Sequence, residues 1–275
     1  MTAPLRFADI PAGHPARKIM SGRTPTFAAQ ADQRFAYTCY VPPDYRDDEP
    51  ALKLWVFVHG TSRRYDRYLD GFADLATRQR AIVLAPLFPA GILDPNDATN
   101  YHLVEYQGIR FDAILLSMID EIAHRWNVAK DRFFLHGNSG GGQFAHRFLY
   151  LHPDRLNAVS IGAPGQITLP TADAPWWRGV GRLEDTFGIA FNAEAVKRVP
   201  AQIVVGSLDN NPADIASQPG SPGGEDRLSR ARTLHDHLLA LGGQVQLDIV
   251  PGVGHDGAGI LPTVSSFLET TLQTR

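Results

Sequence analysis

One serine stands among four glycines in the stretch GNSGGG at residues 137–142. The stretch satisfies the pattern G-x-S-x-G, and it lies between a strand-like apolar run and a helix-like run. This context is typical of a nucleophile elbow, a strained strand-to-helix turn that exposes a serine hydroxyl. The glycines two positions before and after the serine leave room for a close strand-helix crossing, and the N–H of Gly140 is placed to stabilise an oxyanion. Ser139 is therefore the predicted nucleophile, whereas Gly142 has no role in this scheme.

A serine hydroxyl becomes nucleophilic when a histidine accepts its proton and an acid orients that histidine. Asp209 follows the apolar run QIVVG and is the predicted acid, with Asp214, farther into the same loop, as the alternative. His255 lies in the glycine-rich stretch VPGVGHDGAGI, directly after a strand-like segment, and is the predicted base. The other histidines in this half of the chain that we considered lie in helix-like segments, where a packed or exposed role is expected: His146, His235 and His237.

A second oxyanion donor is expected in the loop that follows the apolar run LKLWVFV. We predict that the backbone N–H of Thr61 is this donor, with Ser62 as the alternative. His59, at the start of the loop, is interpreted as a structural brace. Arg63 and Arg64 come next, and we expect two solvated side chains rather than contacts to an anionic substrate.

Short apolar runs that alternate with helical patterns predict an open, mostly parallel α/β sheet with helices on both faces. The expected strands are Phe35–Val41, Leu52–Val58, Ala81–Ala85, Phe133–Leu135, Ala158–Ile161, Ile203–Val205 and Val245–Val250. The expected helices are Tyr68–Arg80, Phe111–Trp126, Gly142–Leu151, Arg227–Leu241 and Leu261–Leu272, with a short one near Ala193–Arg198.

Three connections are longer than usual: 88–110, 164–198 and 210–226. All follow strand ends, so we expect them to crowd the carboxyl edge of the sheet, where ligands bind in such folds. We predict a single domain over residues 1–275, with an N-terminal arm at 1–34 and a cap-like insertion at 164–198. Within the insertion, Trp176 and Trp177 are candidates for an apolar substrate wall, although a packed cap core fits them equally well.

Composition excludes several classes of function. The net charge is −3 without a basic cluster, so no nucleic acid is expected as a partner, and no apolar run approaches the length of a membrane span. No signal peptide is recognisable, which predicts a cytoplasmic protein. The single cysteine, Cys39, lies in a strand-like run and is expected to be a buried structural thiol. No metal-binding or nucleotide-binding motif is present, and we expect no cofactor.

The motifs together resemble the α/β-hydrolase superfamily, and more narrowly the bacterial LpqC-like esterases related to poly(3-hydroxybutyrate) depolymerases. The resemblance extends over most of the chain, and GGQFAHR and PGVGHDG are its most specific parts. It implies an α/β-hydrolase fold and places the nucleophile, acid and base on Ser139, Asp209 and His255. It also places the oxyanion donors on Gly140 and on the residue after His59-Gly60. Asn138 departs from the histidine that many relatives have there, and at most it lines the pocket.

The expected function is that of a serine carboxylesterase-type hydrolase, which cleaves a small or oligomeric ester through an acyl-enzyme. An amidase or peptidase with the same three residues is the first alternative. A hydrolase-like binding protein with little turnover is the second. The acyl and alcohol groups of the substrate and the oligomeric state are not predicted by the sequence.

Overall fold

The computed structural model describes residues 5–216 and 220–273, and the chain divides into two compact units. The first unit extends as far as Tyr101 and resumes from Glu105 to Phe133. The second takes up His102–Val104 and the chain from Phe134 onward. The predicted nucleophile, acid and base all belong to the second unit, whereas Thr61 belongs to the first.

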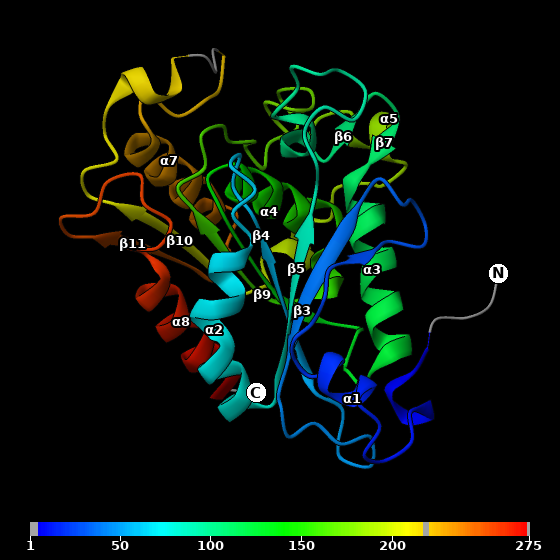
Figure 1. Ribbon diagram of the computed structural model, residues 1–275. Helices are drawn as coiled ribbons and strands as arrows, with labels where there is room; N and C mark the ends of the chain where they lie inside the picture. The colour runs from blue at the N-terminus through cyan, green and yellow to red at the C-terminus, as the bar shows by residue number, and fades with distance from the viewer. Residues whose placement is uncertain (1–4, 217–219, 274–275) are drawn as a thin grey trace. The chain divides into compact units, whose positions relative to one another are not determined.

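The first unit is built on strands in the order β1-β3-β5-β4, with β2 paired to β3. Figure 1 shows β3, β5 and β4 side by side in this order. β4 and β5 are parallel, while β3 is antiparallel to β5. Rings from α2 pack against the sheet, with the centroids of Phe57 in β4 and Phe72 in α2 4.3 Å apart. The described elements are η1 (Phe7–Asp9), α1 (Ala16–Ile19), β1 (Gly22–Arg23), β2 (Phe27–Ala28), β3 (Ala36–Val41), β4 (Lys53–Val58), α2 (Asp66–Gln79), β5 (Ala81–Leu87), β6 (Glu105–Tyr106), β7 (Ile109–Arg110) and α3 (Phe111–Arg125), with η2 (Asn100–Leu103) at the division between the units.

The segment predicted as an N-terminal arm packs on the first unit, as far as it is described. Phe7, Ile10 and Met20 are buried, and the Trp126 indole N–H donates to the Met20 carbonyl oxygen. Strands β1 and β2 pair with β3 in this segment. The residues at 1–4 lie outside the described part of the chain.

The second unit has strands in the order β8-β9-β10-β11. β9, β10 and β11 are parallel neighbours. Helix α7 packs on β10 and β11, whereas α8 packs on β9 and β10 from the other face (Figure 1). The described elements are β8 (Phe133–Asn138), α4 (Gly140–Leu151), η3 (Pro153–Arg155), β9 (Leu156–Gly162), α5 (Leu183–Phe187), α6 (Ala193–Val196), β10 (Ala201–Gly206), η4 (Pro212–Ile215), α7 (Arg227–Ala240), β11 (Val245–Val250) and α8 (Leu261–Gln273).

Every predicted strand and helix has a counterpart within a few residues, so the α/β alternation is confirmed. β11 differs from the buried strands, because it ends the strand order and its side chains are half-buried or exposed. The hairpin of β6 and β7 was not predicted, since two-residue strands leave no periodic pattern. Cys39 is fully buried in β3, as expected, and burial raises the pKa of its thiol.

The 164–198 segment of the second unit folds back on itself. Leu169 pairs with Gly179 and Pro175 with Gly181 as isolated bridges, and α5 and α6 follow. The ring of Trp176 meets that of Phe187 edge-on at 4.9 Å, which ties the bridged part to α5. The 210–226 connection contains η4, and its residues 217–219 lie outside the described part. Within the ranges that the structure describes, no helix is both long enough and apolar enough to cross a bilayer.

Candidate active site

Ser139 stands between the end of β8 and the first residue of α4. Its φ is +58° and its ψ is −115°, a strained backbone for a residue with a Cβ. The close crossing that such a turn needs is present, because a Cβ on Gly137 would lie 2.2 Å from the carbonyl oxygen of Gly141. The Ser139 N–H donates to the carbonyl oxygen of Gly162 at 2.9 Å, which ties the turn to the end of β9. The predicted elbow geometry is therefore present.

Gly142 has a role that the sequence did not indicate. A Cβ at this position would lie 2.2 Å from the carbonyl oxygen of Gly162. That carbonyl is the same one that accepts the Ser139 N–H. The third glycine of α4 therefore lets the helix approach β9 closely enough for the elbow to be held by a backbone hydrogen bond.

Ser139, His255 and Asp209 form one hydrogen-bonded chain. The His255 Nε2 lies 3.0 Å from the Ser139 Oγ, and its Nδ1 lies 2.7 Å from the Asp209 Oδ2. An ionised carboxylate only accepts hydrogen bonds, so the Nδ1 carries the proton and the Nε2 is free to accept the serine proton. The Asp209 side chain is 1% exposed and the His255 side chain 30% exposed. The acid Asp209 is therefore buried, the base His255 is partly exposed, and Ser139 lies at the turn.

Two loops that follow parallel strands place the acid and the base. The N–H of Ser207 donates to the Val250 carbonyl oxygen, and the N–H of Leu208 donates to that of Val253, each at 2.9 Å. These bonds continue the pairing of β10 and β11 beyond the strand ends, so Asp209 and His255 leave the sheet side by side. Asp214, the alternative acid, lies in η4, where its Oδ1 accepts from the Asn211 side chain at 3.2 Å. The geometry favours Asp209.

The predicted oxyanion donors lie in different units. In the second unit, the helical hydrogen bonds of α4 begin with the N–H of Gln143, which donates to the carbonyl oxygen of Ser139, the residue before the helix. The N–H of Gly140 precedes it and is one of the unfilled donors at a helix N-terminus. Thr61 lies in the first unit, in the turn that follows β4. Its role stays a prediction.

His59 braces the loop that carries Thr61, as the sequence indicated. The side chain is fully buried, and its Nε2 accepts the Phe88 N–H at 3.0 Å while its Nδ1 donates to the Gly60 carbonyl oxygen at 2.8 Å. Burial lowers its pKa to about 3, so the ring is neutral. The Tyr101 hydroxyl donates to the His59 carbonyl oxygen at 2.8 Å.

The expectation of a solvated Arg63 is wrong. Its guanidinium donates to the carbonyl oxygens of Thr61, Phe88 and Ala98 and to the Asn100 side chain. Burial lowers its pKa from the ordinary value. Arg63 therefore holds the loop after β4 to the part of the 88–110 connection that lies in the first unit. Arg64 is exposed and pairs with Asp66, as expected for a surface arginine.

The three candidate substrate contacts occupy different surroundings. Asn138 is 8% exposed, and its side chain lies between the backbones of Gly162 and Gly257. Trp176 and Trp177 are half-buried in the folded-back segment. The guanidinium carbons of Arg147 and Arg178 lie 6.0 Å and 5.4 Å from the centroid of the Trp177 ring. A substrate-binding role for these three side chains stays a prediction.

Buried polar groups join α4 to the folded-back segment. His146 accepts the Thr168 N–H at 3.0 Å, and its other ring nitrogen contacts the Gly142 carbonyl oxygen, so its role is structural. Arg147 is fully buried and donates to the Thr168 Oγ1 and the His102 carbonyl oxygen. Burial lowers the pKa of Arg147 to about 9.

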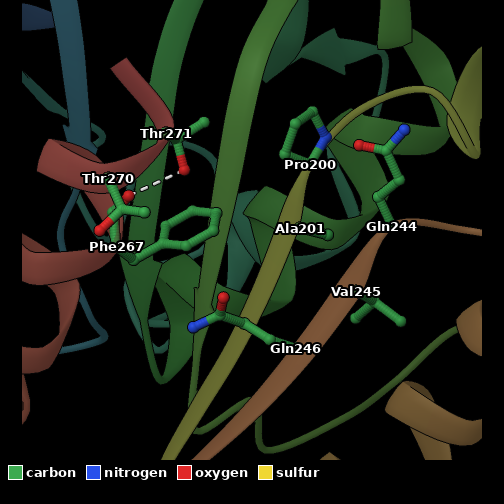
Figure 2. Close-up of a pocket in the computed structure, with 8 residues that line it drawn as sticks. All are labelled: Pro200, Ala201, Gln244, Val245, Gln246, Phe267, Thr270 and Thr271. Carbon is green, nitrogen blue, oxygen red and sulfur yellow. Dashed lines mark hydrogen bonds between the residues drawn. The ribbon is translucent and has the colours of Figure 1, made fainter. Parts of the chain in front are cut away.

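A hollow of about 500 Å³ lies at the opposite ends of β10 and β11 from Asp209 and His255 (Figure 2). Its lining contains neither acids nor bases: Pro200, Ala201, Gln244, Val245, Gln246, Phe267, Thr270 and Thr271. In the described ranges, no three histidine, cysteine or acidic side chains gather as metal ligands would.

Arg227, the first residue of α7, contacts the predicted acid and was not predicted as a site residue from the sequence. Its Nη1 donates to the Asp209 Oδ1 at 3.1 Å, and its Nη2 donates to the Asp214 carbonyl oxygen at 3.2 Å. The side chains of Arg227 and Asp209 are 8% and 1% exposed. No motif announces this arginine, because it lies 18 residues from the acid and beyond an irregular loop.

Several solved structures are similar to the structure of this chain. No family model and no curated protein matches the chain. Poly(aspartic acid) hydrolase-1 from Sphingomonas sp. KT-1 is 20% identical with a TM-score of 0.73, and the match covers 90% of this chain and 98% of that one. LpqC, a poly(3-hydroxybutyrate) depolymerase from Bordetella parapertussis, is 24% identical with a TM-score of 0.70, over 95% and 94%.

A third similar structure is FphF, a fluorophosphonate-binding serine hydrolase from Staphylococcus aureus. It is 16% identical with a TM-score of 0.57, and the match covers 86% of this chain and 91% of that one. At these identities the likeness concerns the fold. The strand order, the elbow and the matched structures together show that this chain has an α/β-hydrolase fold.

Proposed function

We propose that this protein is a serine hydrolase that cleaves carboxylic esters through an acyl-enzyme. The observation that supports this most strongly is the chain of two short contacts from the Ser139 Oγ through His255 to Asp209. The likeness to structures described as esterases and hydrolases agrees with it. This function needs only side chains and backbone groups of the chain itself.

In this mechanism the Ser139 Oγ attacks the ester carbonyl carbon while the His255 Nε2 takes the hydroxyl proton. Asp209 holds the imidazole in the tautomer that this transfer requires and stabilises the imidazolium that forms. The N–H of Gly140 stabilises the negative oxygen of the tetrahedral intermediate. The intermediate collapses, His255 gives its proton to the leaving alcohol, and an acyl group remains on Ser139. Water then repeats the sequence and releases the acid.

The first test is labelling with a fluorophosphonate probe, which reacts with activated serines. We expect the wild type to be labelled and Ser139→Ala to stay unlabelled. Multiple-turnover release of p-nitrophenol from short-chain esters, with Ser139→Ala as the blank, then separates an enzyme from a binding protein. Equal labelling of both proteins would contradict Ser139 as nucleophile, and labelling without turnover would favour a binding protein.

An amide substrate is the second candidate. The structure of poly(aspartic acid) hydrolase-1 is similar to this chain with a TM-score of 0.73, and poly(aspartic acid) is a polymer joined by amide bonds. The same three side chains can cleave either bond, since the acyl-enzyme is the same. Comparing a p-nitrophenyl ester with the p-nitroanilide of the same acyl group decides between the two. A kcat/KM for the anilide equal to or above that for the ester would favour the amidase.

The preferred length of the substrate is measured with a library of esters in which the acyl and alcohol groups are varied separately. LpqC is described as a poly(3-hydroxybutyrate) depolymerase, so oligomers of 3-hydroxybutyrate belong in the library. Activity that rises with oligomer length favours an oligomeric ester. Activity on short esters alone favours a small-molecule substrate.

A further inference from the structure

Asp209 uses its two carboxylate oxygens for two different partners. The Oδ2 contacts the His255 Nδ1 at 2.7 Å, and the Oδ1 accepts from the Arg227 Nη1 at 3.1 Å. Within residues 5–216 and 220–273, Arg227 is the only side chain other than His255 that bonds this carboxylate. The orientation of the predicted acid therefore depends on a residue of helix α7.

The start of α7 holds Asp209 by its backbone as well. The Leu228 N–H donates to the Asp209 carbonyl oxygen at 3.1 Å, and Asp226 caps the helix through the Ser229 N–H at 2.8 Å. Arg227 also donates to the Asp214 carbonyl oxygen, so it bridges η4 to the acid. These contacts fix the position of the guanidinium, because its own helix and the loop it spans are both anchored.

The burial of Arg227 is costly unless its charge is paired. Only 8% of its side chain is exposed, and its Nε has no hydrogen-bond partner among the described residues. The single carboxylate that contacts it is the one that also serves His255. Buried ion pairs add little net stability compared with apolar side chains of the same size, so this pair is poorly explained as a stability device.

We propose that Arg227 is a positioning residue of the candidate active site. It holds the Asp209 carboxylate by the Oδ1 so that the Oδ2 faces His255, and its positive charge opposes a second positive charge on the imidazole. The guanidinium therefore works against the protonated form of His255, which cannot act as a base. This inference rests on the proposed function of Ser139, His255 and Asp209.

The other charged groups around this pair do not replace Arg227. Asp214 turns its carboxylate to Asn211, and Asp226 turns its own to Ser229. Asp256, next to His255, accepts the Ala258 N–H and is exposed. Arg230, one turn along α7, is as buried as Arg227, but it donates to the carbonyl oxygens of Gly165 and Gly224.

The experiment compares Arg227→Gln, Arg227→Lys and Arg230→Gln with the wild type. We measure kcat/KM for a p-nitrophenyl ester against pH, and the acid limb is the fall in kcat/KM toward low pH. Glutamine keeps a donor without the charge, so we expect this limb to move about one pH unit upward. Above that limb, its kcat/KM should stay about tenfold below that of the wild type, because glutamine cannot bridge Asp209 and Asp214 either. Arg230→Gln removes an equally buried arginine that does not touch Asp209, and its limb should stay in place. A limb in Arg227→Gln that stays in place or moves to lower pH overturns the proposal.

Arg227→Lys keeps the charge and removes the guanidinium. It therefore tests the positioning role separately from the charge, and it also tests the proposal if the glutamine variant fails to fold. We expect its acid limb to match the wild type, while kcat falls by about tenfold and KM stays within about twofold, because a lysine cannot bridge Asp209 and Asp214 as a guanidinium does. A wild-type kcat, or a limb shifted as far as that expected for glutamine, contradicts the proposal.

A measurement without substrate distinguishes failure of this inference from failure of the proposed function. The His255 ring resonance is assigned by comparison with His255→Asn and followed by NMR against pH. A midpoint that rises in Arg227→Gln and not in Arg230→Gln supports the role of Arg227 even if no ester is turned over. Equal midpoints in the three proteins overturn it, whether or not the wild type is an esterase.

Discussion

Gly142 and Gly162 approach each other so closely that a Cβ on Gly142 would lie 2.2 Å from the Gly162 carbonyl oxygen. Gly162 also accepts the Ser139 N–H through that oxygen. The contact joins the first turn of α4 to the end of β9, directly beneath the predicted nucleophile.

Gly142→Ala should destabilise the protein although alanine is the better helix former. The added methyl group meets backbone atoms that can move only with β9, and overpacking of this kind costs about 1–3 kcal/mol. Urea unfolding of wild type and variant measures the change. Gly254→Ala is the control, because a Cβ there meets nothing within 4 Å. An unfolding free energy in Gly142→Ala equal to or above that of the wild type contradicts the prediction.

Ser139→Gly should be more stable than Ser139→Ala while both lack activity. Alanine keeps the Cβ that strains the backbone at a φ of +58°, whereas glycine adopts this conformation freely. The expected difference in unfolding free energy is about 1–2 kcal/mol in favour of glycine. Urea unfolding and fluorophosphonate labelling are measured on the same samples. Equal stability of the two variants means that the turn stores no strain at this residue.

Arg63→Ala should lower kcat/KM on the best ester by at least about tenfold, since it releases the loop on which Thr61 lies. The guanidinium donates to the carbonyl oxygen of Thr61 and to those of Phe88 and Ala98 in the 88–110 connection. Arg64→Ala is the matched control, and its kcat/KM should stay within about twofold because its side chain pairs only with Asp66 at the surface. The prediction fails if Arg63→Ala keeps the wild-type kcat/KM.

Stability should fall as the pH is lowered, because buried histidines, His59 and His136 among them, must stay neutral in the folded state. Burial lowers the pKa of His59 and of His136 from the ordinary 6.5 to about 3. The unfolded chain therefore binds more protons than the folded one between these values. The stabilisation is complete above pH 6.5 and is lost as the pH falls toward 3.

Each of these histidines should lower the unfolding free energy by about 2 kcal/mol at about pH 5, relative to about pH 7.5. Urea unfolding at the two pH values measures the loss of unfolding free energy in the wild type and in His136→Asn. The shorter asparagine side chain can still bond Ser160, as the Nδ1 of His136 does. The loss between the two pH values should be about 2 kcal/mol smaller in the variant. An identical loss in both proteins contradicts the assignment to His136.

Several features could be read from the sequence because they depend on local order. The apolar runs and helical stripes predict β3 to β5 and β8 to β11 with their helices, since burial on a sheet imposes such patterns on consecutive residues. The Ser139 elbow was recognisable because the strand, the small residues and the helix are contiguous. The choice of Asp209 and His255 followed from their places after two predicted strands.

Other features were decided by tertiary structure alone. Arg63 has the same local surroundings as Arg64, yet only the fold brings three carbonyl oxygens to its guanidinium. β11 has the same kind of sequence as the buried strands and is half-exposed because it ends the strand order.

Gly142 and Arg227 show the physical reason for this limit. The sequence placed Gly142 in a glycine-rich turn, but its contact is with Gly162, 20 residues away on the neighbouring strand. Arg227 is 18 residues from Asp209, with an irregular loop between them. Local patterns record which side chains a segment buries. Which distant backbone or charge a buried group meets is fixed only when the strands and helices pack, because that contact has no period along the chain.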